Sequence, residues 1–162
     1  MSWSSRLFVL LGLLLMQACG FQPRGKTSLP ESVQAIHIAT NDRYSPFYRQ
    51  LSTVVRRNGV KLTVDPDAAD AVIRVSRDDT GRRVLSVSTR NVPAEYDVYY
   101  TVSYAILVDG AVVLEPQTLT LNRDYTYDPT QVLGKTREED TIRNALAADL
   151  AGLVTRRLDA LK

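Results

Sequence analysis

The chain of 162 residues is poor in the side chains that metal centres and nucleophilic active sites require. It has one cysteine, Cys19, and one histidine, His37, which cannot build the Cys/His clusters that hold zinc. No serine lies in a Gly-x-Ser-x-Gly motif, and the glycines are scattered rather than gathered in a phosphate-cradling loop. A lone histidine in a predicted strand is more typical of a structural residue. We therefore expect no catalytic residues, no metal site and no enzyme, with a small hydrolase that uses only carboxylates as an open alternative.

Long apolar runs are also scarce, and the clearest one, Leu7–Met16, has about half of the roughly 20 residues that a membrane-spanning helix needs. Arg6 precedes this run and Ala18 follows it, which is the order of a bacterial secretory signal. Cys19 comes directly after Ala18, and the pattern resembles a lipobox. In a lipobox the cysteine sulfur receives a diacylglycerol, the signal is cut before the cysteine, and the new N-terminus is acylated. The alternative is an ordinary leader followed by a free or buried cysteine.

The lipoprotein prediction sets the domain organisation. Residues 1–18 are predicted as the signal peptide, 19–29 as a lipidated tether and 30–162 as a single domain. Removing the first 18 of the 162 residues leaves 144, enough for one domain with a sizeable core. The formal charge of +2 drops by one with Arg6, and such a near-neutral chain does not indicate nucleic-acid binding. Gly20 stands where an Asp tends to retain such lipoproteins in the inner membrane, which favours the outer membrane, facing the periplasm.

Two segments have the apolar spacing of amphipathic helices. The first is predicted to begin with Ser45 as N-cap and Pro46 as first helical residue, and to end at Asn58-Gly59. Its apolar face comprises Phe47, Leu51, Val54 and Val55. The second is predicted to begin at Thr136, which with Glu139 matches a capping box. Its apolar stripe comprises Ile142, Leu146, Leu150, Leu153, Val154, Leu158 and Leu161.

Other segments alternate between apolar and polar residues, as strands do. Strands are predicted over 33–39 and around 71–75, followed by a hairpin turn at 78–81 and a strand that closes at Arg90. The strongest signal is 94–108, which leads through Asp109-Gly110 into a return strand over 111–125, where Pro116 marks a bulge or an edge. This order predicts an α+β fold, a mostly antiparallel or mixed β-sheet with two amphipathic helices packed on one face.

The residues that suit binding are tyrosines and two cations. Tyrosine is enriched at protein interfaces, so we predict a partner interface that includes Tyr96, Tyr99, Tyr100 and Tyr104. For each tyrosine taken singly, covering the sheet is the simpler explanation. Arg90 and Lys135 lie at predicted element ends, where a charged head can reach a ligand. From the pattern alone, an ordinary solvated cation is the simpler explanation for each.

Four segments, in order behind the lipobox, resemble the LPS-assembly lipoproteins of the LptE type, formerly called rare lipoprotein B. The first is Cys19-Gly20-Phe21 with Arg24-Gly25, and the second comprises Leu29-Pro30, Tyr44-Ser45-Pro46-Phe47 and Asn58-Gly59-Val60. The third is Arg90 with Ala94-Glu95-Tyr96, and the fourth comprises Asp128-Pro129, Leu133-Gly134-Lys135 and Glu138-Glu139-Asp140.

The resemblance implies a two-helix, sheet-built lipoprotein that sits as a plug and assembly aid in the lumen of the outer-membrane LPS-assembly barrel LptD, one to one. It also implies direct binding of lipopolysaccharide, with Arg90 and Lys135 as the contacting cations. Arginine engages phosphate oxygens in a bidentate way and lysine acts as a point charge, so this chemistry suits the phosphates of lipid A. No cofactor is expected beyond the covalent lipid on Cys19. The alternative is a freestanding lipoprotein on the periplasmic side that binds another envelope ligand.

Overall fold

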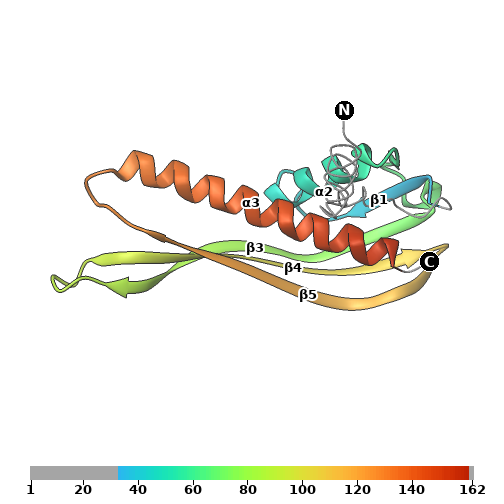
Figure 1. The fold of residues 1–162 in the computed structure, drawn as a ribbon. Helices are drawn as coiled ribbons and strands as arrows, with labels where there is room; N and C mark the ends of the chain where they lie inside the picture. Colours follow the sequence, from blue (N-terminus) through green and yellow to red (C-terminus); the bar gives the residue numbers. More distant parts are fainter. Residues whose placement is uncertain (1–32, 161–162) are drawn as a thin grey trace, which may run out of the picture.

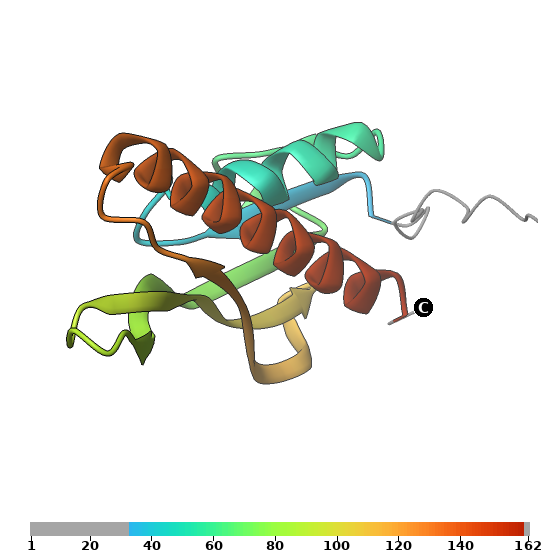
Figure 2. The same ribbon diagram turned by 60° about the vertical axis from the view of Figure 1, so that its left-hand side comes forward.

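The computed structural model describes residues 33–160, so the predicted signal peptide, the tether and Cys19 lie outside the described residues. Five strands form one sheet, and two helices pack on the same face of it (Figures 1 and 2). The elements are β1 (Ala35–Ala39), α2 (Pro46–Arg57), β2 (Lys61–Leu62), the 3₁₀ turn η2 (Pro66–Ala68), β3 (Ala71–Val87), β4 (Pro93–Val108), β5 (Ala111–Thr126) and α3 (Val132–Asp159). The predicted α+β class, with both helices on one face, is confirmed.

The sheet is mixed, in the order β2-β1-β3-β4-β5. Strand β1 runs parallel to β2 and β3, whereas β3, β4 and β5 form an antiparallel meander. The three meander strands have 16 or 17 residues, well beyond the usual range of about 3–10. Their length separates two ends of the molecule. The β3–β4 turn and the start of α3 lie at one end, and the β4–β5 turn lies at the other (Figure 1).

The core fills the space between the sheet and the helices. Alternate residues of β4 supply its sheet side: Val98, Tyr100, Val102, Tyr104 and Ile106 are all buried. Helix α2 adds Phe47, Leu51 and Val55, and α3 adds Ile142, Leu146, Leu150, Val154 and Leu158. A period of two in the strand and of 3.6 in the helices places each set on one face. The predicted apolar faces are therefore confirmed at these positions.

Helix α2 begins and ends as its local signals predict. The Ser45 hydroxyl accepts a hydrogen bond from the backbone N–H of Tyr48 at 3.0 Å, and Pro46 is the first helical residue. Asn58 is the C-cap, and Gly59 follows with a φ of +80°, a conformation that glycine adopts without a steric penalty. The β4–β5 turn is equally local, because Asp109 and Gly110 both have positive φ, as a two-residue hairpin loop requires.

Pro116 lies in a bulge of the outermost strand, as predicted. Tyr104 pairs with Gln117, and Ile106 pairs with Leu114, so β5 advances by three residues where β4 advances by two. Proline lacks the N–H that a regular ladder needs, and a bulge on an edge strand accommodates that loss.

The predicted hairpin turn at 78–81 is wrong, because β3 continues through this segment. The Asp78 carboxylate accepts hydrogen bonds from the hydroxyls of Tyr100 at 2.8 Å and Ser45 at 2.5 Å. Gly81 makes room for the Tyr99 ring, since a Cβ at Gly81 would lie 2.6 Å from the Tyr99 hydroxyl oxygen. These side chains thus serve contacts between strands and with α2, and the chain turns later, between Ser88 and Val92, which are joined by a 2.8 Å backbone hydrogen bond.

Candidate functional site

The two predicted binding cations come from distant parts of the chain and lie at the same end of the molecule. Arg90 lies in the β3–β4 turn, and Lys135 lies in the first turn of α3 (Figures 1 and 2). A groove of about 250 Å³ separates the β3–β4 turn from the β5–α3 connection. It is lined by Ser88, Arg90, Val92, Pro93, Ala94, Tyr127 and Pro129. The structure therefore brings both cations to one end, with a groove beside Arg90.

The two cations differ in their surroundings. Arg90 is exposed, and no hydrogen bond or ion pair engages its guanidinium within residues 33–160. Lys135 is largely covered, and its Nζ lies 2.8 Å from an Oε2 of Glu138 and 6.0 Å from the centre of the Tyr125 ring. Arg90 is thus free to bind an anion, whereas Lys135 would share its charge between an anion and Glu138.

A cluster of three tyrosines supports this end of the sheet. The Tyr96 ring stacks on Tyr125 with centroids 5.8 Å apart and meets Tyr127 edge-on at 5.3 Å. The guanidinium carbon of Arg82 lies 4.6 Å from the centre of the Tyr96 ring, within the range of a cation–π contact. The predicted interface residue Tyr96 therefore packs within the chain and is partly exposed.

The acidic residue that organises this end is Glu139, and the predicted capping box is wrong. Helix α3 begins at Val132, with Gln131 as N-cap, and the Thr136 hydroxyl donates to the carbonyl of Val132 at 3.0 Å. Glu139 is 5% exposed, and its carboxylate accepts hydrogen bonds from Arg82 at 2.6 Å and from the Tyr125 hydroxyl at 3.1 Å. Arg143 donates to its other oxygen. A buried carboxylate needs such partners, so Glu139 faces the sheet instead of capping the helix.

The electrostatics keep this network in its charged, hydrogen-bonded form. Hydrogen bonds to Tyr125 and Glu139, together with the charge of Glu139, raise the pKa of Arg82. Burial is the largest cause of the raised pKa of Tyr125, and its hydrogen bond to Glu139 raises that pKa further. Tyr125 therefore stays protonated and donates to Glu139. The sequence held one signal for this role: Glu139 lies three residues before Ile142, in phase with the apolar stripe of α3.

Two of the four predicted interface tyrosines are core residues, so their assignment to a partner surface is wrong. Tyr100 and Tyr104 are fully buried beneath the helices. The Tyr100 hydroxyl donates to Asp78 and accepts from the backbone N–H of Phe47 at 3.1 Å, and burial is the main cause of its raised pKa. Tyr99 points to the opposite face of the sheet and is partly exposed, so its contact with a partner, like that of Tyr96, stays a prediction.

The face of the sheet that the helices leave uncovered is polar. Cross-strand hydroxyl pairs join Thr101 to Thr120 at 2.9 Å and Ser103 to Thr118 at 2.8 Å. Asp97 lies on this face, almost fully buried between strands, and accepts from Arg83 at 2.8 Å and from the Asn122 amide at 2.9 Å. These polar groups satisfy one another through hydrogen bonds across β3, β4 and β5.

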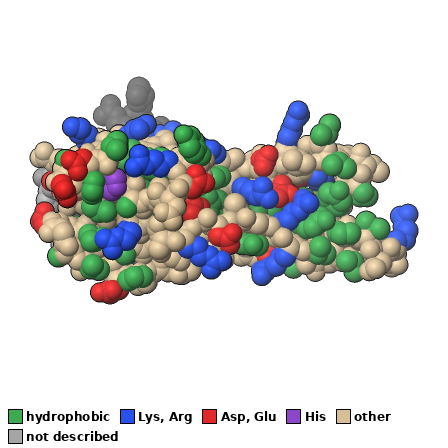
Figure 3. Space-filling model, turned by 180° about the vertical axis from the view of Figure 1, so that it is seen from behind, with side chains coloured by type: hydrophobic (Ala, Val, Ile, Leu, Met, Phe, Trp, Pro, Cys, Tyr) green, Lys and Arg blue, Asp and Glu red, His purple; other side chains and the backbone are tan. Residues whose placement is uncertain are grey.

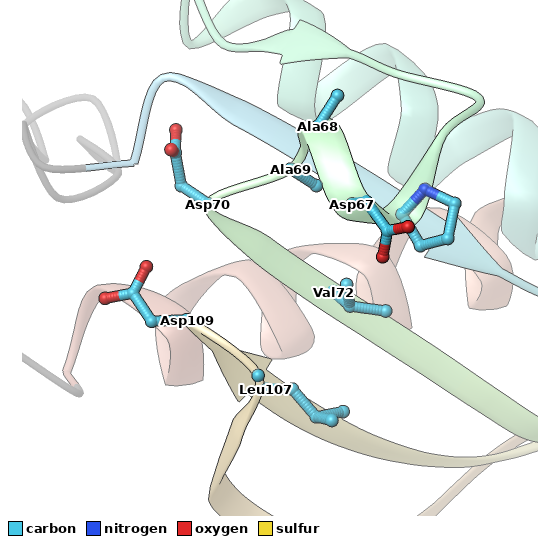
Figure 4. A pocket seen from close by; sticks show the side chains of 9 residues that line it. Asp67, Ala68, Ala69, Asp70, Val72, Leu107 and Asp109 are labelled. Atoms are coloured by element: carbon cyan, nitrogen blue, oxygen red, sulfur yellow. The ribbon is translucent and has the colours of Figure 1, made fainter.

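A larger hollow of about 550 Å³ lies at the other end of the molecule, beside η2 and the β4–β5 turn. The carboxylates of Asp67, Asp70 and Asp109 do not point toward a common centre there (Figure 4). Asp70 accepts hydrogen bonds from the backbone N–H groups of Gln34 and Ala35, both at 2.8 Å, and so has a structural role. In the described part of the chain, no group of three His, Cys, Asp or Glu side chains is placed to hold a metal. His37 bonds to the Thr63 carbonyl at 3.1 Å.

Neither helix within residues 33–160 is long and apolar enough to cross a membrane.

The family model "LptE: Lipopolysaccharide-assembly" matches residues 33–158. The LPS-assembly lipoprotein LptE of Pectobacterium atrosepticum is 29% identical over 157 residues, covering 94% of this chain and 85% of that protein. The LPS-assembly lipoprotein LptE of Yersinia enterocolitica is 27% identical over 155 residues, covering 94% of this chain and 74% of that protein.

Solved structures share the fold. The rare lipoprotein B from Shewanella oneidensis superposes with a TM-score of 0.67 and 27% identity, covering 78% of this chain and 94% of that one. A minor lipoprotein from Acinetobacter baumannii superposes with a TM-score of 0.65 and 28% identity, covering 81% of this chain and 94% of that one. The similarity thus extends through both helices and the long meander.

Proposed function

Because the chain belongs to the LptE family of lipopolysaccharide-assembly lipoproteins, as its four sequence segments predicted, we propose that it binds lipopolysaccharide through Arg90 and Lys135 while it plugs and helps to assemble the LptD barrel. The role is non-enzymatic. Its partners are lipopolysaccharide and one copy of LptD, and the membrane is reached through the lipid anchor.

The observation that carries the lipopolysaccharide proposal is that Arg90 and Lys135 lie at the same end of the fold. Lipid A phosphates are dense anions, and a guanidinium without a protein partner can engage their oxygens in a bidentate way. Lys135 lies in the first turn of a helix of 28 residues, where the helix dipole also favours an anion. Gln131 makes no side-chain cap bond, which leaves the first backbone N–H groups of α3 available to a phosphate.

The two-layer fold supports the proposed place inside a barrel. One face of the sheet is covered by the helices, and the other presents the two cross-strand hydroxyl pairs and the hydrogen bonds of Asp97. The lumen of an outer-membrane barrel is polar, so this face suits it better than it suits lipid. Tyr99, on the same face, is the tyrosine that we expect to contact LptD.

The anchor is proposed from the sequence. Lipidation at Cys19, after removal of residues 1–18, would hold a tether of residues 19–29 and a single domain of 30–162 at the periplasmic side of the outer membrane. Several acyl chains on one cysteine give firm attachment, because each buried CH₂ contributes about 0.8 kcal/mol. The mass of the mature N-terminus tests this directly: an unmodified thiol would contradict it.

The decisive experiment replaces both cations, Arg90→Asp with Lys135→Asp, and measures lipopolysaccharide binding by the full-length protein. Each charge-assisted hydrogen bond contributes about 1.5–3 kcal/mol, so we expect binding to weaken by about a hundredfold or more. The matched control is Lys61→Asp with Arg74→Asp, which removes one exposed Lys and one exposed Arg from the other half of the molecule. Equal binding by the two double variants would reject the site.

The barrel partnership has its own test, which separates the proposal from a freestanding lipoprotein that binds another envelope ligand. After extraction in a mild detergent, we expect the protein to co-purify with LptD in a one-to-one complex. Recovery of the protein as a lone monomer would favour the freestanding alternative.

A further inference from the structure

We propose that the end of the molecule that carries Arg90 and Lys135 also holds a subsite for the acyl chains of the lipopolysaccharide, so that phosphates and chains are bound together. This inference rests on the function proposed above. The subsite comprises the apolar groove beside Arg90 and the exposed aliphatic side chains of two segments at the same end of the molecule, 84–92 and 132–133.

Exposed aliphatic side chains are concentrated at this end. Most of the large apolar side chains that are exposed within residues 33–160 belong to these two short segments: Val84, Leu85, Val87, Val92, Val132 and Leu133. Leu133 is 81% exposed and lies in the first turn of α3, two residues before Lys135. Figure 3 shows hydrophobic side chains gathered with basic ones at the right-hand end. Exposed apolar residues scattered singly are normal, whereas a gathered set indicates a binding surface.

Strand pairing connects these side chains to the tyrosine cluster and the groove. Val84 pairs with Tyr96, whose ring contacts Tyr125 and Tyr127. Tyr127 lines the groove, and Lys135 lies over the Tyr125 ring. These contacts link the end of β3, through the tyrosine cluster, to Lys135 in the first turn of α3.

The groove itself fits part of a chain. Its volume of about 250 Å³ is below the roughly 300–1,000 Å³ of pockets that enclose a whole small molecule. Apart from Arg90 and Ser88, its lining consists of Val92, Pro93, Ala94, Tyr127 and Pro129. An apolar lining with a single cation suits a hydrocarbon segment that ends near an anion.

Charge complementarity favours an anionic amphiphile over a second copy of the chain. In a two-fold contact the same patch faces itself, so Arg90 and Lys135 of one copy would confront those of the other. A molecule that has phosphates on one side and acyl chains on the other instead pairs with both features of this end.

The test compares lipopolysaccharide with its fully deacylated form, which keeps the phosphates and lacks the chains. The full chain is reconstituted in phosphatidylcholine nanodiscs, and empty nanodiscs supply the background. The variant is Leu85→Ser with Leu133→Ser, and both positions are exposed, which protects folding. The control is Val64→Ser with Val112→Ser, at positions of similar exposure (74% and 50%, against 81% for Leu133 and 55% for Leu85) in the other half of the molecule.

We expect the Leu85/Leu133 variant to bind lipopolysaccharide about 15- to 60-fold more weakly, because it loses the equivalent of two or three buried CH₂ groups. It should bind the deacylated form as the wild type does. Equal losses for both ligands, or equal binding by variant and control, would overturn the subsite. A dimer of the wild type in sedimentation that the variant abolishes would also overturn it, in favour of a second copy. If the wild type binds neither ligand, the proposed function fails as well, so the two failures are distinguishable.

Discussion

Replacing Glu139 by glutamine tests whether one buried carboxylate holds the start of α3 against the sheet. Glu139 joins Arg82 and Tyr125 of the sheet side to Arg143 of its own helix. Breaking a buried ion pair costs about 3–5 kcal/mol. Here the side chains of Arg82 and Arg143 are 45% and 30% exposed, so water can recover part of that cost, and glutamine still offers an acceptor. We expect a loss of about 2 kcal/mol in the free energy of unfolding.

The assay is urea unfolding of the full chain in a mild detergent, followed by far-UV circular dichroism. With a urea dependence of about 1–3 kcal/mol/M, the midpoint should drop by about 1 M. Asp140→Asn is the matched control, because Asp140 is the next residue, is 62% exposed and lies 3.7 Å from Arg143.

A second control addresses the capping box. Thr136→Ala should change the free energy of unfolding by less than about 0.5 kcal/mol, whereas loss of a true N-cap costs typically about 1 kcal/mol. The reasoning is refuted if Glu139→Gln is no more costly than Asp140→Asn, or if Thr136→Ala has the larger effect.

Two further predictions concern hydrogen bonds elsewhere in the described chain. Tyr100→Phe should lower the free energy of unfolding by about 1–3 kcal/mol in the same urea assay, because Asp78 loses a donor and the N–H of Phe47 loses its acceptor; a neutral result would show that water replaces the hydroxyl. Hydrogen bonds from Thr130 are the main cause of the lowered pKa of Asp128, so their stabilisation is present above the ordinary value of 3.8 and is lost as the pH falls through the lowered pKa. Amide exchange at Thr130, corrected for its intrinsic pH dependence, should lose protection at low pH in the wild type, and an identical profile in Asp128→Asn would contradict this.

Elements whose signals are local could be predicted from the sequence. Ser45, Pro46 and Asn58-Gly59 set the ends of α2 through contacts within a few residues, and Asp109-Gly110 turns the chain by itself. The turn predicted at 78–81 is wrong because Asp78 forms hydrogen bonds with Tyr100 and Ser45, which are 22 and 33 positions away in the sequence. A turn preference counts only neighbours, whereas these partners are brought together by the tertiary fold.

At the candidate site, too, local features could be predicted from the sequence, whereas contacts between distant segments could not. Element ends were predicted for Arg90 and Lys135, but their joint role came from the family resemblance, because spacing says nothing about which ends meet. The spacing of Thr136 and Glu139 predicts a capping box, although the phase of Glu139 with Ile142 places Glu139 on the buried face. Tyr100 and Tyr104 share one strand face with valines, and a helix layer above that face made them core residues.

The parallel pairing of β1 with β3 decides where the chain enters the domain. Gln34 bonds to Asp70, whose carbonyl accepts from Asp109, so the entry point adjoins the β4–β5 turn. A strand of 16 residues at about 3.3 Å each then separates it from the β3–β4 turn by roughly 50 Å. A chain that arrives from before residue 33 therefore joins the domain at the pole opposite the cations.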